Sequence, residues 1–288
     1  MDSVVVLIAA PGSGAITPEI VAMLRDFGGG EARWLKTGDA LEFDAPAQLP
    51  ELKRALGNLP LDCGAVPKHN RRKRLLIADM DSTMIDQECI DELGVVAGVG
   101  DRIKDITARA MRGELDFNAA LRERVALLKG LDTSVIGSVL KNRITFASGG
   151  RTLLATMKAH GAHTALVSGG FTTFTGPVAA ALTFDENHAN TLLVENGRLT
   201  GQVALPILGK EAKVERLKAI CAARGLSSDD VLAVGDGAND IPMLLAAGLG
   251  VALHAKPNVQ AKVSACINHG DLTALLYLQG YRSADFVV

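Results

Sequence analysis

Residues 75–86 read LLIADMDSTMID, a short apolar run followed by Asp79 and Asp81. The run Leu75–Ala78 is typical of a buried β-strand, and polar residues follow where that strand would leave a sheet. Because residues two apart in an extended chain share a face, both carboxylates are expected to point into one site. Neighbouring carboxylates raise each other's pKa unless a cation neutralises one of them. The pattern suits a nucleophile, a proton shuttle and a divalent metal, with a turn cap or a calcium loop as the alternatives.

Composition limits the class of protein. The chain has 288 residues, of which 48% are hydrophobic, and a formal net charge of −2. This length suits one large core plus a small domain, and the balanced charge gives no reason to expect a nucleic-acid partner. Four cysteines without paired spacing fit a reduced, cytoplasmic protein. Residues 164–184 carry no charge, but glycines and Pro177 interrupt them, so no membrane span is expected.

Residues 1–66 predict a small separate domain. Its short elements follow one another in the order βαββαβ, which is typical of a ferredoxin-like module. Residues 67–74 contain the basic run 71–74 and are interpreted as a solvated linker. The expected strands and helices are Val4–Ala9, Pro18–Asp26, Ala32–Lys36, Ala40–Phe43, Pro50–Leu56 and Asp62–Val66.

Residues 75–288 predict an α/β domain with a doubly wound parallel sheet. Apolar strand patterns alternate with helical ones, as in sheets that are covered on both faces. Asn196-Gly197 between two alternating runs indicates a β-hairpin over residues 192–203. The expected strands are Leu75–Ala78, Thr164–Val167, Val231–Val234, Gly250–Leu253 and Ala265–Ile267. The expected helices are Gly150–His160, Lys210–Arg224 and Asn239–Ala247.

A helical insertion is expected at about residues 86–145, between the first and second strands of this sheet. It would lie over the carboxyl end of the first strand, where open parallel sheets bind ligands. Its expected helices are Asp86–Val96, Asp101–Arg112, Phe117–Lys129 and Ser134–Lys141.

Two further strands are followed by polar motifs. Ser168-Gly169-Gly170 offers a hydroxyl and approachable backbone N–H groups, a combination that can cradle a phosphate. Asp236 in GDGAND adds a third carboxylate, which a hard oxygen site for Mg²⁺ requires. Lys213, early in a helical pattern, can balance phosphoryl charge. The chain contains no complete dinucleotide fingerprint, no P-loop motif and no G-x-S-x-G.

The chain contains, in this order, DMDST, VSGG, Lys213 and GDGAND. This set resembles the motifs of the haloacid-dehalogenase superfamily of phosphohydrolases. Their spacing and the helical insertion resemble, more narrowly, the phosphoserine phosphatases, over residues 75–280. The resemblance implies a cytoplasmic, Mg²⁺-dependent enzyme that hydrolyses O-phospho-L-serine through an aspartyl-phosphate, the last step of serine biosynthesis. A phosphoserine:homoserine-type phosphotransferase, a phosphatase of another small phosphomonoester and a non-catalytic amino-acid-binding regulator are the alternatives.

The resemblance also implies roles for individual residues. Asp79 corresponds to the nucleophile, and Asp81 to the general acid and base. Ser168, Gly169 and Lys213 match positions that bind the phosphoryl group. The implied Mg²⁺ ligands are Asp79, Asp236 and the backbone carbonyl of Asp81, with Asn239 beside substrate and metal and Asp240 close to the metal.

Substrate recognition is expected from the insertion. In the family that the chain resembles, Glu88 matches a residue that binds the substrate's ammonium group, and Arg124 matches one that binds its carboxylate. A guanidinium fork suits a carboxylate geometrically. Met111 and Phe117 would close the apolar side. Taken alone, Glu88 is also compatible with an acid at a helix terminus, and Arg124 with a surface residue on an amphipathic helix.

The N-terminal segment resembles the amino-acid-binding regulatory domains of the ACT type, though with a divergent loop. Those domains carry an acidic residue before Pro-Gly after their first strand, whereas residues 9–14 here read AAPGSG. Serine sensing, homodimer formation and a stabilising role are all compatible with this segment.

Overall fold

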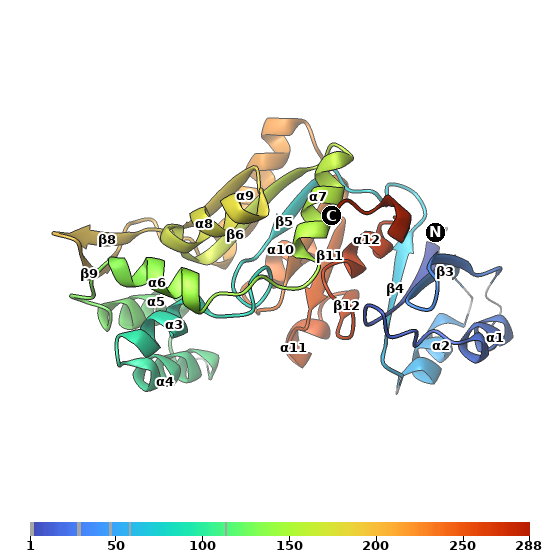
Figure 1. Ribbon diagram of the computed structural model, residues 1–288, viewed down its shortest axis with the longest axis horizontal. Coiled ribbons are helices and arrows are strands. Elements are labelled where there is room, and N and C mark those ends of the chain that lie inside the picture. The colour runs from blue at the N-terminus through green and yellow to red at the C-terminus, as the bar shows by residue number, and fades with distance from the viewer. Residues whose placement is uncertain (1–2, 28–29, 46–47, 58, 113) are drawn as a thin grey trace. The chain divides into compact units, whose positions relative to one another are not determined.

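The computed structural model describes residues 3–27, 30–45, 48–57, 59–112 and 114–288 (Figure 1). The chain forms two compact units. The first unit contains residues 1–77, 148–164 and 218–288, and the second contains residues 78–147 and 165–217. No helix in the described part of the chain is long and apolar enough to cross a membrane. The domain boundary predicted at residues 67–74 stays a prediction.

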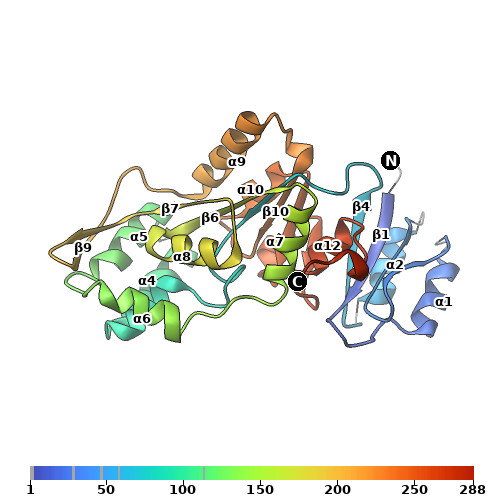
Figure 2. The same ribbon diagram turned by 45° about the horizontal axis from the view of Figure 1, so that its top comes forward.

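The N-terminal part of the first unit has the predicted βαββαβ order. Its four strands form an antiparallel sheet in the order β2-β3-β1-β4. Helices α1 and α2 cover one face of this sheet (Figure 2), where they bury the side chains of Val5, Leu7 and Phe43. Assignment of this module to the ACT type stays a prediction. The elements are β1 Ser3–Ala9, α1 Pro18–Asp26, β2 Arg33–Lys36, β3 Ala40–Asp44, α2 Leu49–Leu56 and β4 Leu61–Pro67.

The N-terminal module packs against the C-terminal segment within the first unit. Strand β4 contacts β12 (Ala265–Ile267), and β1 contacts α12 (Ala274–Leu278). The buried carboxylate of Asp62 accepts hydrogen bonds of 2.7, 3.0 and 2.8 Å from the backbone N–H groups of residues 268–270. These bonds satisfy three N–H groups of the loop that follows β12 and tie it to β4.

The prediction that the basic run 71–74 is solvated was wrong for Arg71 and Lys73, whereas Arg72 and Arg74 are exposed. Arg71 forms a largely buried ion pair with Glu42 at 2.7 Å and donates to the carbonyl of Leu278. Lys73 is 8% exposed, and its ammonium group donates to the carbonyls of Asn70 and Asp229 at 2.7 Å. The physical reason is that buried carbonyl groups need donors, and long basic side chains can reach them.

A second sheet has six strands in the order β12-β11-β10-β5-β6-β7. The pairs β10–β11, β11–β12 and β6–β7 are parallel. Strand β5 has the predicted bounds, and its four side chains are fully buried, as expected for the apolar run of a covered sheet. The predicted α/β class with a parallel sheet is confirmed. The other strands are β6 His163–Phe171, β7 Glu186–Asn190, β10 Val231–Gly235 and β11 Leu249–Leu253.

Two boundaries near the motifs differ from the predictions. Strand β6 continues to Phe171 instead of ending at Val167, with an irregular register between these two residues. Helix α10 begins at Ile241 rather than Asn239, because Asp240 is its N-cap residue. The remaining helices are α7 Gly150–Ala159, α8 Thr172–Leu182, α9 Lys210–Arg224 and α11 Pro257–Gln260.

The predicted helical insertion lies in the second unit. Its four helices gather beside the hairpin β8–β9 (Figure 1), with α5 in contact with β9 and α3 in contact with α4 and α6. Helix α3 begins three residues later than predicted, because Asp86 and Gln87 bond Thr145 through their side chains. The elements are α3 Cys89–Val96, α4 Gly100–Met111, α5 Phe117–Ala126, α6 Ser134–Asn142, β8 Leu192–Glu195 and β9 Arg198–Val203.

Candidate active site

A buried ion pair lies at the carboxyl end of β5. Asp79 follows the last residue of this strand, and its Oδ1 atom lies 2.8 Å from the Nζ atom of Lys213 in α9. The backbone N–H of Met80 donates to the same oxygen at 2.8 Å. The two side chains are only 7% and 1% exposed. Water screens such a pair weakly, so the ammonium group orients the carboxylate.

Asp81 lies two residues further along the chain, in a different electrostatic setting. Its Oδ1 accepts a 2.8 Å bond from the backbone N–H of Cys89, and the Ser168 hydroxyl lies 3.4 Å from its Oδ2. Burial, followed by the negative charges of Glu88 and Asp79, raises the pKa of Asp81 to about 7. A carboxyl group with such a pKa exchanges its proton readily near neutral pH. The two carboxylates of DMDST are therefore suited to different tasks.

The segment Ser168–Gly170 passes close to Asp81. The Ser168 hydroxyl oxygen accepts a 2.8 Å bond from the N–H of Gly170. A Cβ atom on Gly170 would lie 2.8 Å from Oδ2 of Asp81 and 3.0 Å from Oγ of Ser168, closer than real Cβ contacts. Only glycine therefore lets this backbone approach the carboxylate. The phosphate cradle predicted for this segment stays a prediction.

Asn190 is a residue of this site that the sequence did not indicate. Its side chain is buried at the end of β7, and its amide NH₂ donates to the carbonyls of Gly169 (2.8 Å) and Leu208 (3.2 Å). Its Oδ1 accepts from the N–H of Leu208 at 2.7 Å. The Asn190 side chain thus links the segment Ser168–Gly170 to Leu208, which lies just before α9, the helix that contains Lys213. It belongs to no recognised motif, so only its buried contacts reveal the role.

Replacing Asn190 with Ala is expected to destabilise the protein and to lower its activity. Two buried backbone groups of Leu208 and the half-buried carbonyl of Gly169 would lose their partner, at a cost of about 1–3 kcal/mol for an unsatisfied buried group. Urea unfolding measures this loss, and steady-state kinetics measures the effect on the cradle. The matched control is Asn142→Ala, because Asn142 is exposed and bonds only the Ser138 hydroxyl at 3.2 Å. Equal stability of the two variants would contradict the role assigned to Asn190.

The predicted recognition residues of the insertion lie near these carboxylates in the second unit. Glu88 is the N-cap residue of α3, and its Oε1 accepts a 2.8 Å bond from the hydroxyl of Ser82. The Glu88 side chain keeps contact with solvent. Burial by surrounding protein atoms, followed by the negative charges of Asp79 and Asp91, raises its pKa. Burial lowers the pKa of Arg124 on α5, although the negative charges of Asp91, Glu88 and Asp81 act to raise it. A cation and an anion thus lie within electrostatic reach of Asp81.

Of the two residues predicted to form the apolar side of the site, the structure describes the side chain of Phe117. Phe117 is the first residue of α5, and its ring lies beside two glycines. A Cβ on Gly169 would be 3.1 Å from this ring, and one on Gly209 would be 3.4 Å from it. Met111 ends α4, and its side chain lies outside the described part of the structure.

The first unit contributes the GDGAND motif after β10. Asp240 is fully buried, and its Oδ2 accepts a 3.0 Å bond from the N–H of Gly237. A Cβ on Gly235 would lie 2.5 Å from the carboxyl carbon of Asp240, so this glycine allows the carboxylate to fold back. Asp236 and Asn239 are partly exposed. This tight turn holds the Asp240 carboxylate against the backbone of the motif.

Among the described residues, three carboxylates form a group that can hold a metal ion. One oxygen each from Asp79, Asp236 and Asp240 lies within 4.8 Å of the others. Oxygen-only ligands of this kind suit Mg²⁺. Three carboxylates and the one ammonium group of Lys213 leave two negative charges, which a divalent cation would balance. The donor set therefore fits the ion.

The fold and these motifs define a phosphohydrolase-like enzyme. The family of haloacid dehalogenase-like hydrolases matches residues 76–245. The chain belongs to this family.

Within the family, several curated relatives of this chain are phosphoserine phosphatases. That of Lactococcus lactis is 48% identical over 204 residues, which are 71% of this chain and 94% of the relative. The chain spans a smaller share, 52% and 65%, of the relatives from Streptomyces coelicolor and Haemophilus influenzae.

Solved structures extend the likeness beyond the catalytic motifs. A haloacid-dehalogenase family hydrolase from Salmonella enterica has a TM-score of 0.86 at 33% identity, covering 96% of this chain and 98% of that one. A probable phosphoserine phosphatase from Vibrio cholerae has a TM-score of 0.81 at 31% identity, covering 98% and 88%. Both alignments cover nearly the whole chain, and therefore most of its N-terminal module.

Proposed function

We propose that this protein hydrolyses O-phospho-L-serine to L-serine and phosphate, the last step of serine biosynthesis. The observation that carries the proposal is the pair of carboxylates after β5: Asp79 held by Lys213, and Asp81 with a pKa of about 7. The similarity to curated phosphoserine phosphatases supports the choice of substrate. The charged groups Glu88 and Arg124 match the ammonium and the carboxylate of a phosphorylated amino acid.

In the first half of the reaction, an oxygen of Asp79 attacks phosphorus. The new O–P bond forms while the bond from phosphorus to the serine oxygen breaks. Protonated Asp81 gives its proton to that oxygen, and serine leaves. Ser168, the N–H groups of the glycine segment and Lys213 stabilise the phosphoryl charge.

In the second half, water attacks the phosphorus of the aspartyl-phosphate. Asp81, now a carboxylate, removes a proton from that water, and cleavage of the Asp79–phosphorus bond releases phosphate and restores the nucleophile. Mg²⁺ bound by Asp79, Asp236 and the carbonyl of Asp81, with Asn239 and Asp240 beside it, would supply charge neutralisation and orientation. The assignment of these ligands is part of the proposal.

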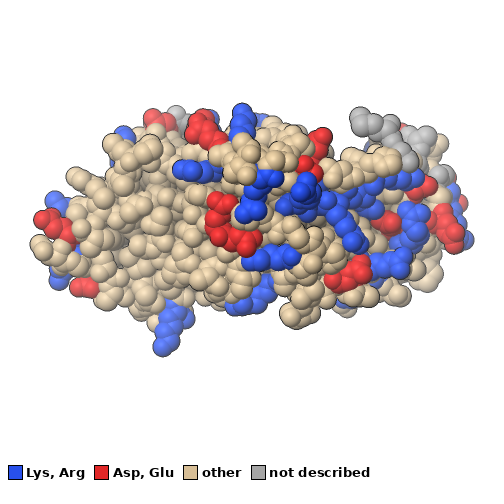
Figure 3. All heavy atoms as spheres, turned by 90° about the horizontal axis from the view of Figure 1, so that it is seen from above, with Lys and Arg blue, Asp and Glu red and all other residues tan. Residues whose placement is uncertain are grey.

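We further propose that Glu88 binds the substrate's ammonium group and Arg124 its carboxylate, with Phe117 and Met111 on the apolar side. Ser82 holds Glu88 through its hydroxyl at 2.8 Å. On the face seen in Figure 3, basic and acidic groups lie beside one another over the middle and right part of the picture. A cytoplasmic location, a homodimer and an effector of the N-terminal module stay predictions from the sequence.

The proposal predicts phosphate release from L-phosphoserine that requires Mg²⁺ and stops with EDTA. Rates should be compared with those on phosphothreonine, phosphoethanolamine and p-nitrophenyl phosphate. A preference for phosphoserine over phosphoethanolamine and p-nitrophenyl phosphate is expected, because only phosphoserine of these three carries both the ammonium and the carboxylate group. Phosphothreonine carries both groups and one more methyl group, so its rate measures how the site treats size. Metal-dependent hydrolysis without that preference would contradict the proposed substrate while leaving the chemistry intact. Formation of phosphohomoserine when homoserine is added would instead identify a phosphotransferase.

A further inference from the structure

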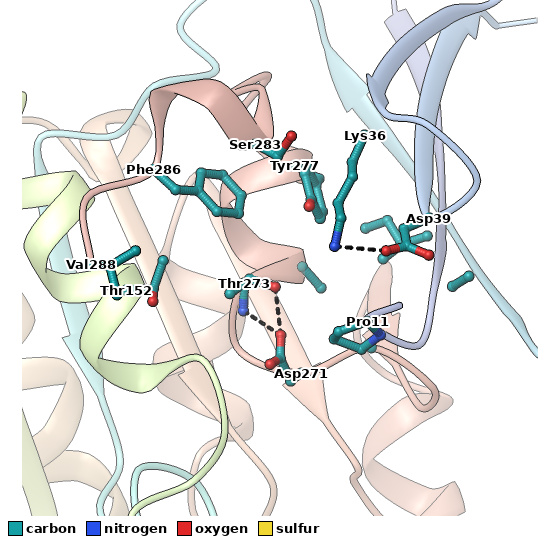
Figure 4. Close-up of a pocket in the computed structure, with 14 residues that line it drawn as sticks. Pro11, Lys36, Asp39, Thr152, Asp271, Thr273, Tyr277, Ser283, Phe286 and Val288 are labelled. Atoms are coloured by element: carbon teal, nitrogen blue, oxygen red, sulfur yellow. Dashed lines mark hydrogen bonds and ion pairs between the residues drawn. The ribbon is translucent and has the colours of Figure 1, made fainter. Parts of the chain in front are cut away.

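A cavity of about 190 Å³ lies within the first unit, remote in sequence from the catalytic motifs (Figure 4). Its wall combines the turn between β2 and β3 with the segment that contains α12 and the end of the chain. A single buried water needs only about 15 Å³, whereas pockets for drug-sized ligands start at about 300 Å³. The cavity therefore has the size for a small metabolite.

The charged groups on its wall are mainly acidic. Asp39 and Asp271 line the cavity from opposite sides, and Lys36 is the cation between them (Figure 4). The Lys36 ammonium lies 2.8 Å from Oδ2 of Asp39, so this pair is neutral. Asp271 accepts hydrogen bonds from Thr273 and from the hydroxyl of Ser148, and it forms no ion pair with a described residue. The net charge of the wall is negative, which favours a cationic ligand.

The hydroxyl of Tyr277 supplies a second, independent indication of a ligand. This side chain is 5% exposed, and its oxygen points into the space beside Lys36 and Thr273 (Figure 4). Among the described residues, the hydroxyl has no hydrogen-bond partner in the structure. Burial, with the charges of Asp39 and Asp271, raises the pKa of Tyr277 to about 12, so the group stays protonated. Because this hydroxyl opens into the cavity, a ligand there can hydrogen-bond with it.

Aromatic faces complete the wall. The rings of Tyr277 and Phe286 lie 5.1 Å apart between centroids, tilted by 38°, and both residues line the cavity. The negative faces of aromatic rings attract ammonium groups, and their apolar surface accepts a short carbon chain.

We propose that this cavity binds a small amino alcohol, with its ammonium group near Asp271 and the aromatic rings and its hydroxyl on Tyr277. The site is separate from the active site and does not depend on the reaction that the enzyme performs. The N-terminal module and the C-terminal segment each supply part of its wall, so a bound molecule would stabilise their contact.

The test uses calorimetric titration and thermal unfolding of the full chain with matched probes. The probes are 4-amino-1-butanol, n-butylamine, 1,4-butanediol and 4-hydroxybutyrate, which differ in one functional group each. The amino alcohol is expected to bind most tightly and to raise the midpoint of unfolding, whereas the diol and the acid should bind weakly or not at all. Equal binding of the diol or the acid, or no binding of any probe, would overturn the proposal.

Variants localise the binding. Tyr277→Phe removes only the hydroxyl. It is expected to weaken binding of the amino alcohol by about threefold to tenfold and to leave binding of n-butylamine unchanged. Asp271→Asn should weaken binding of both amines by at least about tenfold, because the ammonium group loses its bond to a charged carboxylate. Asp44→Asn, an exposed carboxylate on β3, is the matched control. Glu88→Gln must also leave binding unchanged, since a loss there would place the amine in the active site and refute the proposal.

Discussion

Replacing Asp79 with Asn is expected to abolish turnover in a protein that still folds. The amide cannot attack phosphorus, so the aspartyl-phosphate cannot form, and a loss of at least about a thousandfold in kcat follows. The fold should persist because the amide oxygen can take the place of Oδ1 beside Lys213, at the 2.8 Å seen for the carboxylate. Phosphate release measures turnover, and circular dichroism with thermal unfolding measures folding.

The matched control for this variant is Asp101→Asn. Asp101 lies on the exposed first turn of α4, so its change from acid to amide should leave kcat within about twofold. A trapped phosphoenzyme, detected by mass spectrometry after rapid quenching, should appear in the wild type and be absent from Asp79→Asn. Residual activity within tenfold of the wild type would remove Asp79 from the nucleophilic role.

Replacing Arg124 with Ala is expected to weaken catalysis on phosphoserine far more than on phosphoethanolamine, which has no carboxylate. Truncating one partner of a buried charge pair costs about 2–5 kcal/mol, or about 30-fold to 5,000-fold in kcat/KM. On phosphoethanolamine this bond is never made, so the loss should stay small. The ratio of kcat/KM for the two substrates is the measurement.

Two companion variants make the result specific. Arg122→Ala removes an exposed arginine from the same helix and should leave kcat/KM unchanged on both substrates. Glu88→Gln should give the complementary pattern: a large loss on phosphoserine and on phosphoethanolamine, and a small one on 3-phosphooxypropionate, which lacks the ammonium group. If Arg124→Ala lowered activity on both substrates equally, Arg124 would be a structural residue and not a recognition residue.

Local sequence was sufficient wherever the chemistry of a short segment decides its structure. The strand Leu75–Ala78 has the predicted bounds because four consecutive apolar residues suit only a covered position in a parallel sheet. The hairpin around Asn196-Gly197 formed as predicted because these residues adopt positive φ at low cost; they have φ of +50° and +74°. The order of the N-terminal elements was predictable for similar reasons.

Other features depend on neighbours that lie far away in the sequence. The basic run 71–74 is polar in composition, yet Lys73 is buried against the carbonyls of Asn70 and Asp229. Strand β7 has the polar sequence ENHAN and no apolar periodicity, so its pairing with β6 was not predicted. The role of Asn190 likewise follows from carbonyls and an N–H group that the folded chain brings to it.

The sequence by itself determined the class of this protein and the chemical groups of its site, because the order and spacing of DMDST, VSGG, Lys213 and GDGAND are properties of the chain alone. Only the tertiary structure decided how those groups differ in behaviour. Asp79 and Asp81 are the same amino acid two residues apart, yet one is paired with Lys213 and the other has a pKa of about 7. The physical reason is that a pKa depends on burial and on charges within a few ångströms, and folding sets both.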